Sequence, residues 1–270
     1  MNRWKLTALD MDGTLLTSDK QLHPETIRDI EKARNEGMQF VYCSGRTIPE
    51  IRLYRDRLPM IRYAVCMSGS LVYDFEEERI LYRRAVEQKY ALCIIEAAKE
   101  DDGMVHLLSD TESIVRGDQV THMADFCRAE YQETFLATTR SVTDLRAEAL
   151  KYDSLPKVNI YSRSPAARAR AYEKLKHLPL TFVCIEEASL EINAQGVSKA
   201  NGMKALTDHL GLQMSDVCAI GDSENDRTVL QAAGFSIAMG NAEPSIKELC
   251  DAETDDNDHN GVGKAIRMCM

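Results

Sequence analysis

The chain has no long hydrophobic run. Its longest apolar stretches, such as Tyr90 to Ile95, are far shorter than the roughly 20 residues of a membrane-spanning helix. The apolar stretch after Arg3 and Lys5 is interrupted by Asp10 and Asp12, which is unlike a secretory signal peptide. The 270 residues also lack a basic excess, because 33 Lys and Arg stand against 43 Asp and Glu, for a net charge of −10. This balance argues against a dedicated binder of nucleic acid or of an anionic membrane.

Closely spaced cysteine and histidine pairs are also missing. The eight cysteines include no CxxC pair, and the six histidines show no HxH or HxxH spacing. A zinc site or a disulfide framework needs clustered ligands, whereas scattered thiols are typical of buried cysteines in a reducing compartment. A chain of this length buries enough surface to fold without such cross-links. We therefore expect a cytoplasmic globular protein.

Strand and helix patterns alternate in the first and last eighty residues. The N-terminal part has strand patterns at 6–9, 39–43 and 63–67, separated by helix patterns at 23–37 and 47–58. The C-terminal part continues with a helix at 198–210, strands at 217–220 and 235–239, a helix at 224–233, and short helices at 244–249 and 262–268. Single helices between short strands predict an α/β fold with a parallel sheet.

The middle of the chain has a different organisation. A hairpin pattern at 71–83 encloses the acidic turn 76–78 and is followed by a helix pattern. Strand patterns at 105–108, 114–115, 158–161 and 181–185 then occur with one further helix, at 165–177. Bunched strands predict an α+β unit inserted into the α/β domain. We expect a core domain of residues 1–83 and 188–270 and an inserted domain of residues 84–187.

Two acidic motifs follow predicted strands. The first is Asp10-Met11-Asp12-Gly13-Thr14, and the second is Gly221-Asp222-Ser223-Glu224-Asn225-Asp226. The carboxyl ends of parallel strands meet at one edge of a sheet, where ligands bind in open α/β folds. Carboxylates converging there favour a magnesium site. An Asp-Gly turn and a capped helix start are the plain structural alternatives for the two motifs.

Two further segments indicate an anion site. Ser44-Gly45-Arg46 lies between a predicted strand and a helix, where a hydroxyl and free amides can hold an anion. Lys199 begins a predicted helix, a position that disfavours a positive charge unless it meets an anion. A plain turn and a solvated lysine remain the alternatives.

Together and in this order, the four segments resemble the motifs of the haloacid dehalogenase (HAD) superfamily. Ser44 and Lys199 lie 155 positions apart, which places the insertion as in the C2-type caps of the Cof-type subfamily. Asn241 and Asn257 lie in segments that also match this subfamily. The resemblance implies a Rossmann-like parallel-sheet HAD core with an inserted α+β C2-type cap domain. Ser68 and His259 depart from it, since the subfamily usually has Asn and an acidic residue there.

The resemblance implies a hydrolase acting on phosphoric monoesters, with a small sugar phosphate or similar metabolite as substrate and partner. Asp10 would attack phosphorus to form an aspartyl-phosphate, Asp12 would be the general acid and base, and Ser44 and Lys199 would hold the phosphoryl oxygens. The implied Mg²⁺ ligands are Asp10, the Asp12 carbonyl and Asp222, supported by Asp226. The implied substrate contacts are Gly13, Thr14, Gly45, Arg46 and Asn225.

Two alternatives stay open at the level of sequence. A phosphomutase of the phosphomannomutase type would share the paired aspartates and the cap. A non-catalytic phosphometabolite-binding protein would share the fold. Substrate preference is expected to depend on residues of the inserted domain, and the sequence gives no oligomeric state.

Overall fold

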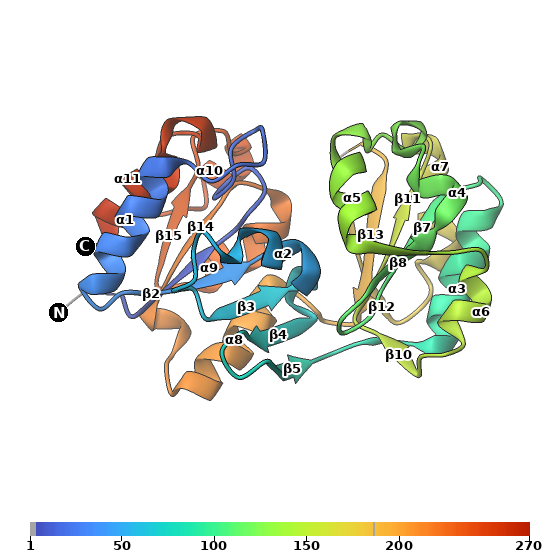
Figure 1. Ribbon diagram of the computed structural model, residues 1–270, viewed down its shortest axis with the longest axis horizontal. Coiled ribbons are helices and arrows are strands. Elements are labelled where there is room, and N and C mark those ends of the chain that lie inside the picture. Colours follow the sequence, from blue (N-terminus) through green and yellow to red (C-terminus); the bar gives the residue numbers. More distant parts are fainter. Residues whose placement is uncertain (1–3, 186) are drawn as a thin grey trace. The chain divides into compact units, whose positions relative to one another are not determined.

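A computed structural model describes residues 4–185 and 187–270 (Figure 1). These residues divide into two compact units. The core unit comprises the described residues up to 46 together with 51–82 and 198–270, and the cap unit comprises 47–50 and 83–197. Each unit has its own sheet.

The core sheet has eight strands in the order β16-β15-β14-β1-β2-β3-β4-β5. In sequence order these are β1 (Leu6–Leu9), β2 (Gln39–Cys43), β3 (Tyr63–Cys66), β4 (Leu71–Asp74), β5 (Arg79–Arg83), β14 (Val217–Gly221), β15 (Phe235–Ala238) and β16 (Ala252–Glu253). The strands from β16 to β3 are parallel, and β4 is antiparallel to β3. Every residue of β1, β3 and β14 is buried, as expected for a sheet covered on both faces. The predicted α/β fold with a parallel sheet is confirmed.

Helices connect these strands. They are α1 (Pro24–Asn35), α2 (Ile48–Arg55), α8 (Lys199–Leu210), α9 (Arg227–Ala232), α10 (Pro244–Lys247) and α11 (Gly261–Cys269), with single 3₁₀ turns at η1 (Met67–Gly69), η4 (Met214–Asp216), η5 (Glu224–Asp226) and η6 (Asn257–His259). Helices α1 and α11 pack side by side (Figure 1). The Ser198 side chain caps α8 by accepting from the Asn201 amide, and Gly211 ends it in the left-handed conformation. The helix expected at 224–233 is divided between η5 and α9.

The cap sheet is mixed and has the order β12-β13-β11-β7-β8-β9. Its strands are β7 (Met104–Leu108), β8 (Ser113–Arg116), β9 (Thr139–Val142), β11 (Lys157–Tyr161), β12 (Leu180–Ile185) and β13 (Ser189–Ala194), and β6 (Val86–Glu87) pairs separately with β10 (Ser154–Leu155). The cap helices are α3 (Gln88–Lys99), α4 (Gly117–Val120), α5 (Gln132–Thr138), α6 (Leu145–Ala149) and α7 (Pro165–Leu175), with η2 (Met123–Phe126) and η3 (Ala129–Tyr131). Alternate strand residues such as Leu107, Val158 and Ile192 pack with α3 in one apolar cluster.

Two parts of the cap differ from the sequence-based expectation. Strand β13 pairs with β11 and β12, so the cap unit continues to residue 197 instead of ending near residue 187. The segment 117–149, for which no element was expected, contains α4, α5, α6 and β9.

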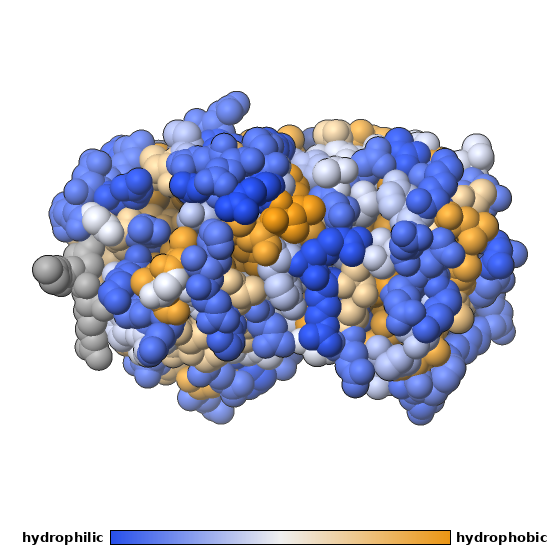
Figure 2. Space-filling model, turned by 90° about the horizontal axis from the view of Figure 1, so that it is seen from below, coloured by the Kyte–Doolittle hydropathy of each residue, from blue (hydrophilic) through white to orange (hydrophobic). Residues whose placement is uncertain are grey.

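Hydrophilic residues cover most of the face in Figure 2, with apolar residues in separate areas between them. Among residues 4–185 and 187–270, no helix is both long and apolar enough to cross a bilayer.

Candidate active site

Two neighbouring parallel strands bring the acidic motifs together. Strand β1 pairs with β14 in a register that places Leu9 opposite Ile220. The Asp10 amide extends this ladder by donating to the Ile220 carbonyl over 3.1 Å. Both motifs therefore begin at the same edge of the sheet, as the sequence predicts.

Three carboxylates converge at this edge. One oxygen each from Asp10, Asp222 and Asp226 lies within 4.8 Å of the others. The Thr14 hydroxyl donates to Asp222 Oδ1 over 2.7 Å, which orients that carboxylate. Gly13, at φ +75°, allows the approach, because a Cβ there would lie 2.4 Å from Asp222 Oδ2. This oxygen-only group has the donor chemistry of a magnesium site.

A fully buried lysine neutralises part of this charge. Lys199 Nζ donates to Asp10 Oδ1 over 2.6 Å, to Asp226 Oδ1 over 2.6 Å and to Asn225 Oδ1 over 3.0 Å. Asp226 Oδ2 accepts from the amides of Asp222 and Ser223, each over 3.2 Å. Asp226 therefore holds Lys199 with one oxygen and the motif backbone with the other. Asp10 Oδ2 accepts no hydrogen bond from the described residues.

The electrostatics of the cluster favour an added cation. Burial and the negative charge of Asp226 raise the pKa of Asp10 well above its ordinary value, against the effect of Lys199. Burial and Asp226 also raise the pKa of Asp222, to about 6. Burial alone would lower the pKa of Lys199, but Asp10 and Asp226 outweigh it and raise that pKa. Ionised, the three carboxylates and the lysine have a net charge of −2, which a divalent cation would neutralise.

Asp12 lies in a different electrostatic environment from Asp10. Arg46 Nε donates to Asp12 Oδ2 over 2.7 Å, and Arg46 Nη2 donates to Oδ1 over 2.8 Å. Lys20 Nζ donates to Asp12 Oδ1 over 2.8 Å. Burial would raise the pKa of Asp12, but the hydrogen bonds and charges of Arg46 and Lys20 lower it. Asp12 is thus held as a carboxylate.

Ser44 contacts the turn Met67–Gly69, which packs against the start of α8. Its hydroxyl accepts from the Arg46 amide over 3.2 Å, and its carbonyl accepts from the Ser68 amide over 3.1 Å. Met67 and Ser68 both have positive φ, 51° and 59°, an unusual conformation for two consecutive non-glycine residues. A Cβ on Gly69 would lie 2.0 Å from the Ser198 carbonyl oxygen. The strained turn therefore lies against the residue that precedes Lys199.

Several expected residues have contacts that the sequence did not specify. Arg46 binds Asp12 in a bidentate ion pair, and the Thr14 hydroxyl binds Asp222. The Asp12 carboxylate lies outside the group of three carboxylates. Glu224, the remaining acid of the second motif, is exposed and pairs with Arg227.

Three neighbours of the first motif had no assigned role. Lys20 binds Asp12, and no pattern in the sequence points to it. The side chain of Asn241 donates to the Gly13 carbonyl over 2.8 Å, and that of Asn257 donates to the Leu16 carbonyl over 2.9 Å. Their only signal was that both lie in segments that match the subfamily.

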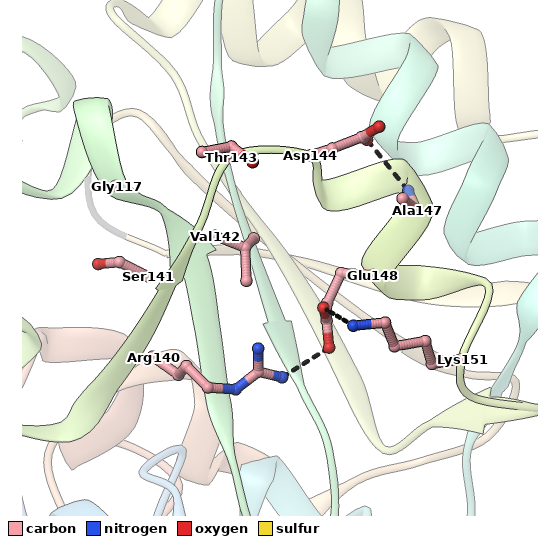
Figure 3. Close-up of a pocket in the computed structure, with 9 residues that line it drawn as sticks. All are labelled: Gly117, Arg140, Ser141, Val142, Thr143, Asp144, Ala147, Glu148 and Lys151. Atoms are coloured by element: carbon pink, nitrogen blue, oxygen red, sulfur yellow. Dashed lines mark hydrogen bonds and ion pairs between the residues drawn. The ribbon is translucent and has the colours of Figure 1, made fainter.

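A separate cavity of about 490 Å³ lies within the cap, between residue 117, the segment 140–144 and the face of α6 (Figure 3). Arg140 and Lys151 point toward Glu148 and donate to it over 2.6 and 2.7 Å. Arg140, Glu148 and Lys151 thus already bind one another, and Asp144 accepts from the Arg146 and Ala147 amides. No group of three metal ligands lies there among the described residues.

Comparisons with known proteins identify the family of the chain. Residues 7–266 match the family described as haloacid dehalogenase-like hydrolase. The chain is 27% identical over 267 residues to 5-amino-6-(5-phospho-D-ribitylamino)uracil phosphatase YcsE of Bacillus subtilis, covering 97% of this chain and 94% of YcsE. It is 28% identical over 278 residues to pyridoxal phosphate phosphatase YbhA of Escherichia coli, covering 97% of each chain.

Solved structures share the fold. A haloacid dehalogenase-like hydrolase from B. subtilis superimposes with a TM-score of 0.87 at 23% identity, over 98% of this chain and 100% of that one. The subclass IIB sugar phosphatase BT4131 superimposes with a TM-score of 0.82 at 20% identity, over 98% of each chain. These matches confirm the parallel core sheet with an added mixed cap sheet. The resemblance read from the sequence is also confirmed, because the family match spans nearly the whole chain: the protein belongs to the haloacid dehalogenase-like hydrolases.

Proposed function

We propose that this hydrolase is a magnesium-dependent phosphatase that cleaves a small phosphomonoester through an aspartyl-phosphate on Asp10. The observation that carries the proposal is the buried Asp10 carboxylate, held through Oδ1 by Lys199 beside Asp222 and Asp226. The two phosphatases with which the chain shares 27% and 28% identity over nearly its full length support the same reaction class.

Asp10 has the features of a nucleophile. Lys199 fixes Oδ1, and Oδ2 remains available for in-line attack on phosphorus. The attack forms the Asp10 Oδ2–P bond and breaks the bond from phosphorus to the ester oxygen. Lys199 is also placed to hold a non-bridging phosphoryl oxygen near Asp10 as charge moves. Asn225 keeps the ammonium in this position through its Oδ1 contact.

The donor set fits Mg²⁺. Asp10 and Asp222 would bind the ion, with the Asp12 carbonyl, while Asp226 would support the site through Lys199 and the backbone of its own motif. When bound, Mg²⁺ offsets the repulsion between a carboxylate nucleophile and a phosphate dianion and orients the phosphoryl group. Thr14 contributes by fixing Asp222.

Asp12 is the proposed general acid and base. It would donate a proton to the departing ester oxygen and then remove one from the water that attacks the aspartyl-phosphate. Arg46 and Lys20 hold its carboxylate in position before substrate arrives. A phosphate dianion near Asp12 would compete with its carboxylate for Arg46 and Lys20. Arg46 is therefore also proposed to bind the substrate. Ser44 and Gly45 would supply polar contacts from the same turn.

The proposed substrate class is a small phosphorylated metabolite, such as a sugar phosphate, pyridoxal phosphate or a ribityl phosphate. The names of the two relatives, together with that of the structural neighbour, support this range. Residues of the cap are proposed to set the preference within it. The net charge of −10 further supports a metabolite over a nucleic acid as the phosphate carrier.

The test is phosphate release from a panel of these esters, with Mg²⁺ or with EDTA. We expect release by the wild type with Mg²⁺, and loss of kcat by at least about 10³-fold in Asp10→Asn. Asp208→Asn is the matched control, because Asp208 is exposed and pairs with Lys204 on the surface of α8. Rapid acid quenching should trap labelled phosphate on the peptide that contains Asp10.

Other results would contradict the proposal. No release from any ester in Mg²⁺, or equal release by Asp10→Asn, would refute it. Turnover that appears only with a bisphosphate activator would instead support a phosphomutase.

A further inference from the structure

Two buried thiols lie in contact between strand β14 of the core sheet and helix α11. Cys218 is the second residue of β14, and Cys269 is the last residue of α11. Their sulfur atoms are 3.1 Å apart, and the side chains are 0% and 3% exposed. All eight cysteines are free thiols, and this is the one sulfur pair within hydrogen-bonding distance in the described part of the chain.

The two sulfur atoms are close to bonding distance. A disulfide has a sulfur–sulfur distance of about 2.05 Å, so roughly 1 Å of approach separates the two states. The hydrogen bond between the sulfurs lowers the pKa of Cys269 and, with burial, raises that of Cys218. Cys269 lies at the end of α11 whereas Cys218 lies in a fully buried strand, so Cys269 is the thiol of the pair that a disulfide reagent reaches first.

We propose that Cys218 and Cys269 are an oxidisable pair that forms an intramolecular disulfide in the presence of a small disulfide such as glutathione disulfide. The Cys269 thiolate attacks one glutathione sulfur, which forms a mixed disulfide and releases one glutathione. The Cys218 thiolate then attacks Cys269 Sγ, closes the protein disulfide and releases the second glutathione. Two thiols lose two protons and two electrons, and one glutathione disulfide is reduced to two glutathiones.

The reagent reaches the pair from the end of α11. Met268 and Met270, on either side of Cys269, are 51% and 41% exposed. The last turn of a helix opens more readily than a buried strand, so Cys269 becomes accessible while β14 stays in the sheet. Cys218 remains next to the mixed disulfide, which favours closure over release.

The bond would fasten α11 to the strand whose end carries Asp222. It would close a loop between positions 51 residues apart. Loop closure on this scale is expected to lower the equilibrium constant for unfolding by about a thousandfold in the chain-entropy description. The inference does not depend on the proposed phosphatase activity, because its test measures a covalent bond and stability.

The experiment uses the full chain with the three exposed cysteines, Cys93, Cys127 and Cys184, replaced by Ser. After incubation with excess glutathione disulfide, we expect an intact mass lower by two hydrogens and a disulfide-linked peptide pair containing positions 218 and 269. The midpoint of urea unfolding, followed by Trp4 fluorescence, should rise and return on reduction. Trp4 is the single tryptophan and stacks on Phe235 in the core unit.

Matched variants make the result decisive. Cys269→Ser and Cys218→Ala should each abolish the loss of two hydrogens, while Cys43→Ala, which removes another buried thiol, should retain it. Cys269→Ser alters the end of a helix and keeps the test available if Cys218→Ala does not fold. A persistent glutathione adduct without closure, a link between other cysteines, or an unchanged midpoint after closure would overturn the proposal.

Discussion

Asp222 is expected to destabilise the metal-free fold at neutral pH. Burial and the charge of Asp226 raise its pKa to about 6, from an ordinary value of 3.8. A carboxyl with a raised folded-state pKa contributes full stability below pH 3.8 and loses it as the pH rises through 6. Across this pH interval the lost stability is about 3 kcal/mol at pH 8. Asp222→Asn keeps an acceptor for Thr14 and removes the charge, so it should recover this free energy.

The assay is urea unfolding followed by Trp4 fluorescence, in EDTA and in excess Mg²⁺, from pH 4 to pH 8. In EDTA at pH 8 we expect Asp222→Asn to be more stable than the wild type by about 3 kcal/mol, and by less than about 1 kcal/mol at pH 4. In Mg²⁺ the wild type should gain stability through binding, and the variant should gain far less. Glu224→Gln is the control, because Glu224 belongs to the same motif but is exposed and pairs with Arg227.

Two results would refute this reasoning. One is an Asp222→Asn variant that is less stable than the wild type in EDTA at pH 8. The other is a stability difference that does not shrink toward pH 4. Equal stabilisation of both proteins by Mg²⁺ would show separately that Asp222 is not a ligand.

Three further predictions concern single residues. Lys199→Met leaves buried carboxylates unpaired and should lower the free energy of unfolding in EDTA by about 3–5 kcal/mol. Lys204→Met, at an exposed lysine of the same helix, should lower it by under about 1 kcal/mol, and urea unfolding of both variants checks this. Gly13→Ala at φ +75° should weaken Mg²⁺ affinity, measured by calorimetry, because its Cβ collides with Asp222, and unchanged affinity would contradict that geometry. Burial, with the nearby cations, lowers the pKa of His106 to about 3. The free energy of unfolding of the cap should therefore fall by about 2 kcal/mol between pH 8 and pH 5, because the unfolded chain takes up a proton that the buried imidazole does not. Hydrogen exchange of the β7 amides, corrected for intrinsic rates, measures this. His106→Gln should remove that pH dependence.

The core was predictable because burial and periodicity agree there. The pattern at 217–220 became β14 at Val217–Gly221, in which every residue is buried. The helix expected from His23-Pro24 to Gly37 became α1 at Pro24–Asn35, with Pro24 in its first turn. The segment 117–149 offered no such signal, since α4 has four residues and β9 is largely exposed. Periodicity needs a longer window than these elements provide.

Strand β13 shows a different limit of sequence patterns. Leu190 and Ile192 are buried, but so are Glu191 and Asn193 between them. The sequence does not distinguish a polar residue that is buried in a sheet from one that faces solvent. The alternation of apolar and polar residues could therefore not assign this strand to the cap. Its pairing with β11 and β12 is a long-range property that emerges only in the fold.

The order of the motifs was enough to predict which residues of the candidate site lie together. Asp10, Lys199 and Asn225 are brought together as the resemblance implies. The bidentate Arg46–Asp12 contact and the role of Lys20 depend on side-chain geometry across a turn, for which the sequence has no pattern. Such contacts determine the charge state of a carboxylate, so they matter for the chemistry as much as the motif itself.

The two aspartates of the first motif have opposite shifts in pKa, which bears on how turnover begins. In the metal-free protein the pKa of Asp10 is raised and that of Asp12 is lowered. The proposed hydrolysis needs the reverse, with Asp10 ionised as the nucleophile and Asp12 protonated as the acid. A divalent cation beside Asp10 would lower the pKa of Asp10. A phosphate that draws Arg46 and Lys20 away from Asp12 would raise the pKa of Asp12. We therefore expect cation and substrate together to set the reactive protonation state, so that each should tighten binding of the other.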